Sequence, residues 1–100
     1  MRVALTTRHL AVTKALHHLV QRRANFAFAR FAGRLKEVRL RLVGDGPLVV
    51  CLATARVLPG EIVTVRGTYA TAESAIVDVC ERLRQRIVRS IERRRALARG

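Results

Sequence analysis

Acidic residues are scarce in this sequence. Seven Asp and Glu stand against twenty Lys and Arg in 100 residues, which gives a net charge of +13. All the cations except Lys14 and Lys36 are arginine, whose planar guanidinium pairs well with phosphate. Half of the residues are apolar, so the composition is that of a globular domain and not of a disordered basic tail. The imbalance predicts a folded protein with a polyanionic partner, and nucleic acid suits it best.

Aromatic residues are few as well. The chain has no Trp, three Phe and one Tyr, and they form no run along an expected strand. A sheet that holds single-stranded RNA commonly stacks the bases on aromatic side chains, and this sequence does not supply such a platform. We therefore expect helices to contact phosphates and sugars, and RNA to be recognised by its shape.

Long apolar runs and catalytic motifs are also missing. No window approaches the ~20 apolar residues of a membrane span, and the first residues do not resemble a signal peptide. Cys51 and Cys80 have no metal-ligand spacing, so we expect reduced core residues of a cytoplasmic protein. His17 and His18 are adjacent, which on a helix turns them about 100° apart and makes a shared metal ion difficult. Together these absences predict a protein that is not an enzyme and has no metal, cofactor or small-molecule substrate.

The order of hydrophobic patterns predicts an α+β fold. Strands are expected at 2–6, 36–43, 48–58 and 61–69, and helices at 14–31 and from Thr71 to about Arg95. This order, β-α-β-β-β-α, predicts a four-stranded sheet with two helices packed on one face, as in a double-stranded RNA-binding domain. One hundred residues make a single domain, 1–100, in which 93–100 forms a basic helix end.

Local signals set the expected boundaries. Thr13 and Thr71 are suitable N-caps for the two helices. Gly33 stands where the first helix is expected to stop. Pro59 and Gly60 fit the two central positions of a type II turn, because glycine accepts the positive φ that the second position needs.

Arginines gather on the last helix. Eight of them fall in residues 82–99, with Glu92 as the only acid. At about 100° per residue, four share one strip beside the apolar stripe and span about 16 Å: Arg82, Arg86, Arg89 and Arg93. A solvated charged face is the plain alternative, but the sorting of charge around the helix favours a row of phosphate contacts.

The first helix carries a second group of cations. Arg23 and Arg30 lie seven residues apart near the edge of its apolar face. Their stems could simply cover the core while their charged ends reach water. Alternatively, with Arg22 and Arg34 they form a second positive wall of one groove between the helices, facing the arginines of the last helix.

Three segments resemble the ribosome hibernation-promoting factors, the family of ribosome-associated inhibitors, ribosomal subunit interface proteins and sigma-54 modulation proteins. They are "TTRHLAVTKAL" (6–16), "FAGRLKEVRLRL" (31–42) and "TAESAIVDVCERLRQRIVR" (71–89). The resemblance implies the same fold and no catalytic activity. It also implies a protein that binds 16S rRNA of the small ribosomal subunit in the mRNA and tRNA channel and inhibits translation under stress.

The resemblance also bears on single residues. Arg23, Arg82, Arg86 and Arg89 match basic positions of the family. Thr7 departs from its opening motif, and Thr71 and Glu73 replace an acid and a Tyr, which leaves a divergent paralogue with another RNA target open. Because the chain ends at Gly100, we expect a short form without the C-terminal dimerisation domain of longer members.

Two other functions fit the composition. A general double-stranded RNA-binding module would bind any A-form duplex with comparable affinity. A self-associating structural protein would pair through the open face of the sheet, where Val50 and Leu52 would leave apolar surface for a weak homodimer.

Overall fold

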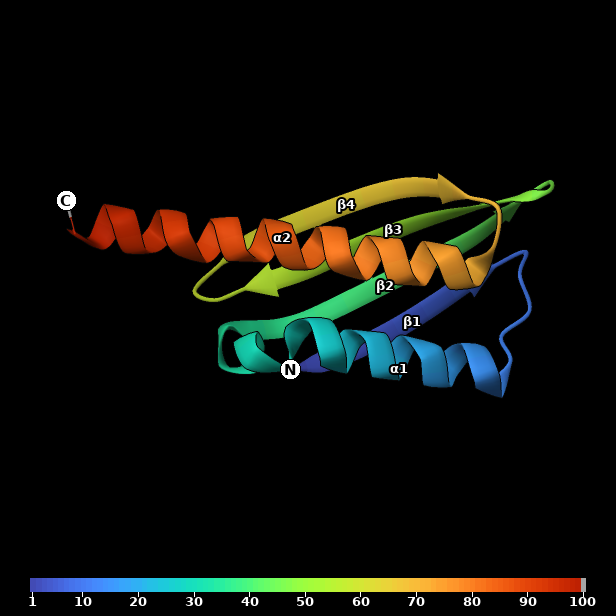
Figure 1. Cartoon of the computed structure of the whole chain (residues 1–100), viewed down its shortest axis with the longest axis horizontal. Helices are drawn as coiled ribbons and strands as arrows, with labels where there is room; N and C mark the ends of the chain where they lie inside the picture. Colours follow the sequence, from blue (N-terminus) through green and yellow to red (C-terminus); the bar gives the residue numbers. More distant parts are fainter. Residues whose placement is uncertain (100) are drawn as a thin grey trace.

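The computed structural model describes residues 1–99, and its elements follow the expected order (Figure 1). The strands are β1 (Arg2–Arg8), β2 (Leu35–Asp45), β3 (Leu48–Val57) and β4 (Glu61–Tyr69). The helices are α1 (Lys14–Phe28), the short 3-10 helix η1 (Ala29–Arg34) and α2 (Ala72–Arg99). The α+β prediction is thereby confirmed. Gly100, the last residue of the expected basic end, lies outside the described residues.

The four strands form one mixed sheet in the order β1-β2-β3-β4. β1 runs parallel to β2, and the other neighbours are antiparallel. Figure 1 shows both helices on the same face, α1 beside β1 and α2 across β3 and β4. Residues 1–99 place no element over the other face, which we call the open face.

Strand alternation decides which side chains reach the core. In β2, the side chains of Val38, Leu40 and Leu42 are fully buried under the helices. Arg39 and Arg41 lie between them in sequence, so they point to the open face and are exposed. Each buried aliphatic side chain stabilises the fold by about 1.5–3 kcal/mol, so this alternation fixes which face meets the helices.

The helices pack through the stripes that the sequence predicts. Ile76, Leu83 and Ile87 of α2 are 0% exposed against the sheet. Thr13 Oγ1 accepts a hydrogen bond from the Leu16 amide at 3.1 Å, and Thr71 caps α2 in the same way. Both predicted N-caps are therefore confirmed.

The first helix ends earlier than expected. Its regular α-helical part stops at Phe28, and the chain continues as η1 through Gly33 to Arg34. Phe28 is fully buried and has φ −120° and ψ −7°, outside the helical region. Gly33 does not adopt a positive φ, so the expected glycine stop is wrong.

The turn between β3 and β4 also differs. The peptide bond between Leu58 and Pro59 is cis, and Gly60 has no positive φ. A type II turn needs positive φ at its third residue, so the prediction of that turn is wrong. Sequence does not distinguish the isomers, because cis and trans X-Pro bonds differ by only about 0.5–1 kcal/mol.

The last turns of α2 project beyond the sheet. The helix has 28 residues, about 42 Å at 1.5 Å per residue. Ile91 is its last buried residue, and all side chains from 92 to 99 are exposed. Figure 1 shows this end reaching past the turn between β3 and β4. No helix in residues 1–99 is long and apolar enough to cross a membrane.

Candidate nucleic-acid interface

Four arginines of α2 form a ridge on the side of the helix that faces β4. We call Arg82, Arg86, Arg89 and Arg93 the ridge. Arg86 and Arg89 line an open groove between α2 and β4, together with Arg93, Ile62, Thr64 and two carboxylates, Glu61 and Glu92. Arg86 and Arg89 are both exposed, and within residues 1–99 no carboxylate oxygen lies within 4.0 Å of either guanidinium. They are therefore available to an external anion.

Arg82, at one end of the ridge, is held by the protein. Its Nη1 donates to the backbone oxygen of Arg66 and to Tyr69 Oη, each at 3.2 Å. The Asp78 carboxylate lies 3.8 Å away and accepts a hydrogen bond from the Tyr69 hydroxyl at 2.5 Å. This cluster ties α2 to β4 and compensates part of the Arg82 charge.

Arg93, at the other end, is also paired. Its Nη2 donates to Glu61 at 3.0 Å. Glu61 opens β4 and also accepts a hydrogen bond from Ser90, whose side chain is completely buried. One carboxylate thus satisfies a buried hydroxyl and fixes Arg93 at the edge of the sheet. In sequence nothing distinguished Glu61 from the other acids, because its partners lie about thirty residues away.

A second groove lies between the helices. Arg30 and Arg34 of η1 line it, and Val88 and Arg95 of α2 lie opposite. The Arg30 guanidinium sits 5.5 Å from the centre of the Phe31 ring, which orients it by a cation–π contact. The η1 wall of this groove is basic, and on the α2 wall Arg95 lies beside the carboxylate of Glu92.

The remaining cations of α1 lie outside both grooves. Burial raises the pKa of the Cys80 thiol to about 11, and Arg23 lies near enough to lower it slightly. Arg23 therefore stands on the side of α1 that faces α2. Arg22 is exposed and lines neither groove.

The single trough expected from the helical pattern is wrong. The ridge lines the groove toward β4, whereas Arg30 and Arg34 line the groove on the opposite flank of α2. A helical wheel gives the angle between a charged strip and the apolar stripe, but it does not show on which side the neighbouring helix packs. The structure therefore presents two basic grooves that flank α2. That these arginines bind RNA stays a prediction.

The flank of α2 away from the ridge carries a separate ion pair. Arg84 donates to both carboxylate oxygens of Glu81, at 3.0 and 2.5 Å. These hydrogen bonds hold the pKa of the Glu81 carboxyl below its usual value. Arg84 is consequently less available to a partner than Arg86 or Arg89.

Two features of the surface could not be predicted from the sequence patterns of the helices. Tyr69 packs against the core, and its hydroxyl also forms hydrogen bonds with Asp78 and Arg82. The outward-facing arginines of the strands share one face, which the charge pattern of the two helices does not reveal. Summing the charge of the residues that alternate outward along each strand, in addition to the charge of the helices, would have identified this face.

Comparisons with known proteins identify the family through one family model and the fold through two solved structures. A family model described as Sigma 54 modulation protein / S30EA ribosomal protein matches residues 3–95. A ribosomal subunit interface protein from Coxiella burnetii superposes with a TM-score of 0.79 and 10% identity, over 92% of this chain and 99% of that one. The N-terminal domain of Thermus thermophilus Protein Y gives 0.73 and 22%, over 89% and 98%. At these identities the two structures show a shared fold alone. Curated protein sequences give no significant match.

Proposed function

This chain belongs to the Sigma 54 modulation protein / S30EA ribosomal protein family, and we propose that it inhibits translation by binding the small ribosomal subunit. The family is one of ribosome-associated factors without catalytic activity. In this proposal the domain occupies the mRNA and tRNA channel and contacts 16S rRNA. It acts by steric competition and needs no chemical step.

One observation carries the proposal beyond family membership: two basic grooves flank the same helix. Arg86 and Arg89 lack carboxylate partners within residues 1–99. Three arginines, Arg30, Arg34 and Arg95, line the other groove with a single acid, Glu92. Exposed guanidiniums in rows suit consecutive phosphates of an RNA strand. The net charge of +13 adds long-range attraction to a polyanion.

The eight predicted arginines receive different roles in this proposal. Arg86 and Arg89 contact phosphate directly, and Arg30 and Arg34 do so from the other groove. Two ridge members, Arg82 and Arg93, share their charge between rRNA and internal partners, and Arg22 and Arg23 extend the basic surface along α1. Contacts of this kind respond to salt, with a log-log slope of about −0.7 to −0.9 per neutralised phosphate.

Co-sedimentation with 30S subunits at two salt concentrations tests the proposal. The double variant Arg86→Glu/Arg89→Glu should lose 30S binding and keep its circular dichroism spectrum, because neither side chain carries a described ion pair. Lys14→Glu/Lys36→Glu changes the net charge equally outside the grooves and should bind far better than the ridge variant. Equal binding by both double variants would contradict the proposed surface.

A competitor separates channel binding from general duplex binding. If the domain were a general double-stranded RNA module, an excess of an unrelated RNA duplex would strip it from the subunits. We expect the 30S complex to survive at duplex concentrations that saturate the free protein, because a channel offers phosphates to both grooves together. Complete displacement would favour the general module.

A further inference from the structure

We propose that the open face of the sheet is a second binding surface for an RNA phosphate backbone, so that one molecule holds two RNA segments at once. The proposal goes beyond the function proposed above, because it concerns the face opposite the helices and does not require a ribosome. It rests on the register of the strands, the balance of charge and the shape of the face.

Strand register places arginines from all four strands on this face. Arg41 of β2 lies opposite Leu52 of β3, and Leu52 lies opposite Arg66 of β4. Neighbouring strands are about 4.8 Å apart, so Arg41 and Arg66 start about 10 Å apart with one apolar residue between them. By the same alternation the face carries six exposed arginines: Arg2, Arg8, Arg39, Arg41, Arg56 and Arg66.

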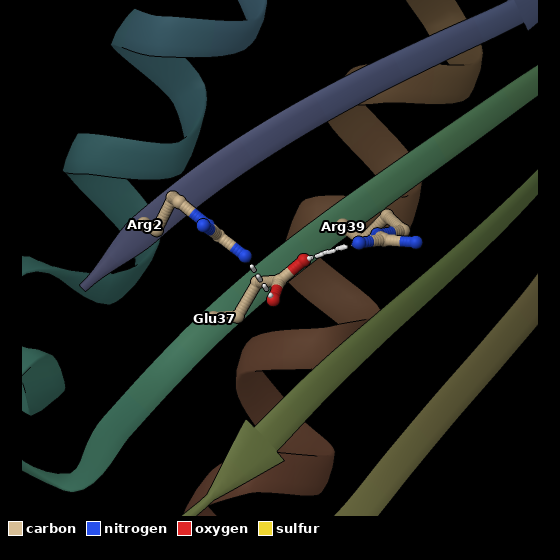
Figure 2. Close-up of polar contacts among 3 residues, drawn as sticks. All are labelled: Arg2, Glu37 and Arg39. Atoms are coloured by element: carbon tan, nitrogen blue, oxygen red, sulfur yellow. Dashed lines mark hydrogen bonds and ion pairs between the residues drawn. The ribbon is translucent and has the colours of Figure 1, made fainter.

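The acids on this face do not neutralise it. Glu37 accepts hydrogen bonds from Arg2 at 3.1 Å and from Arg39 at 3.0 Å, as Figure 2 shows. These two arginines hold the pKa of the Glu37 carboxyl below its usual value, so it stays ionised and is shared between them. The other acid whose position in the strand alternation places it on this face is Asp45, which lies at the end of β2 opposite Leu48.

Four arginines of the face are left without a carboxylate partner. Within residues 1–99 no carboxylate oxygen lies within 4.0 Å of the guanidiniums of Arg8, Arg41, Arg56 or Arg66. Such unpaired like charges on a small sheet repel one another in the free protein. An anion that spans them relieves this repulsion.

The surface is shaped as two connected hollows. One is lined by Arg8, Arg39 and Arg41 with the hydroxyls of Thr6 and Thr54. The other continues from Arg39 and Thr54 past Arg56 of β3 to Ile62 of β4, and the paired carboxylate of Glu37 also lines it. Together the hollows cross the sheet from β1 to β4. Guanidiniums interspersed with threonine hydroxyls are donors that nucleic-acid backbones accept.

The side chains of the open face favour a phosphate backbone over stacked bases or a second copy of the protein. None of its residues is aromatic, so bases have no ring to stack on, and backbone contact is what the face offers. Leu52 and Ile62 are exposed there, at 36% and 62%, and could suggest pairing with a second copy. Pairing would bring two sets of unpaired arginines together, which like-charge repulsion opposes. A phosphate backbone fits both the charge and the hydroxyls.

The two surfaces lie on either side of the sheet and adjoin at its β4 edge, where Ile62 lines both the groove of the ridge and the second hollow. Arg66 points its side chain to the open face, while its backbone oxygen accepts the hydrogen bond from Arg82 of the ridge. The molecule measures 49 × 21 × 18 Å along its principal axes. Phosphates bound on opposite faces would therefore lie about one domain thickness apart, with the protein as a bridge.

A bridging assay with two RNA duplexes tests this directly. One duplex is immobilised through biotin, the other carries a fluorophore, and retained fluorescence reports a bridge. The wild type should retain the second duplex, and Arg41→Gln/Arg56→Gln/Arg66→Gln should reduce retention at least tenfold while still binding the first duplex through the helices. The matched triple Arg→Lys variant keeps the charge at the same positions and should retain bridging. Retention by the Gln variant equal to that of the wild type would overturn the proposal.

A second variant and light scattering distinguish a one-protein bridge from self-association. Arg86→Gln/Arg89→Gln should also lose bridging, because a bridge needs both faces. The mass of the bridged complex should correspond to one protein with two duplexes, and a complex with two proteins would overturn the proposal in favour of self-association. Bridging by a protein that fails to bind 30S subunits would support the second surface and refute the proposed function.

Discussion

Replacing Gly67 by alanine is expected to destabilise the domain through one side chain, Tyr69. A Cβ atom at position 67 would clash with the Tyr69 hydroxyl oxygen and lie 2.6 and 2.7 Å from two ring carbons. The ring lies back over this glycine, two residues earlier on β4, and its hydroxyl is fixed by Asp78 and Arg82. The ring cannot move aside without giving up these hydrogen bonds.

The magnitude follows from two opposed effects. Overpacking or the loss of hydrogen bonds to a charged group costs about 1–3 kcal/mol. Alanine in a strand recovers about 0.5–1 kcal/mol relative to glycine. We expect Gly67→Ala to lower the free energy of unfolding by about 1–2 kcal/mol, which for a domain of this size lowers Tm by about 4–16 °C.

A double-mutant cycle isolates the contact. In a Tyr69→Ala background the clash is gone, so Gly67→Ala should become neutral or stabilising. Gly33→Ala is the matched control, because a Cβ there meets nothing within 4 Å, and it should not lower stability. Thermal and urea unfolding followed by circular dichroism measure each of these proteins. The same loss in both backgrounds would refute the role assigned to the Tyr69 ring.

Three further predictions concern titratable groups. Burial and the hydrogen bond to Asp78 raise the pKa of Tyr69 above 10, and Arg82 partly opposes this shift. The contribution of Tyr69 to folding stability is therefore present below pH 10 and lost as pH rises through the raised pKa. Ultraviolet titration of this sole tyrosine should show a high midpoint, and the midpoint should fall in Asp78→Asn. Glu37 has a pKa below 4.5 because Arg2 and Arg39 donate hydrogen bonds to it. Its contribution to folding stability is therefore present above pH 4.5 and lost as pH falls through the lowered pKa. In urea unfolding over the acid range, the free energy of unfolding should fall less steeply with pH in Glu37→Gln, and an unchanged profile would contradict the assignment. Burial raises the pKa of Cys51 to about 12 and that of Cys80 to about 11. Iodoacetamide at neutral pH should therefore modify both thiols only after unfolding. If mass spectrometry shows rapid labelling of the native protein, their placement in the core is contradicted.

The order of elements and both N-caps could be predicted because they depend on short-range patterns. Alternation in β2 and β3 and steps of three and four in α2 each identify the face that is buried, and the structure agrees. Boundaries were less predictable. The regular part of α1 ends at Phe28, whose side chain is fully buried and whose φ and ψ leave the helical region, and no local sequence signal marks this position.

The geometry of the candidate site was predicted only in part. The pattern found the four ridge arginines on one strip, but it placed them opposite Arg30, on the wrong flank of α2. It also gave no weight to Glu61, whose contacts with Ser90 and Arg93 depend on how β4 meets α2. Ion pairs between residues distant in sequence decide which arginines lack a carboxylate partner, and a local sequence pattern does not predict those pairs.

The projecting end of α2 has a consequence for hydrogen exchange. Residues 92–99 hold no buried side chain, so the last turns of α2 have little of the tertiary packing that supplies most helical stability in proteins. Its crowded arginines further favour opening in the free protein, so the amides of these turns should exchange within the first moments in deuterated buffer. An anionic surface that covers the segment would close it into continuous helix and slow that exchange. Beyond Arg93, which its ion pair with Glu61 holds at the edge of the sheet, the end of α2 is then rigid only while it contacts an anionic partner.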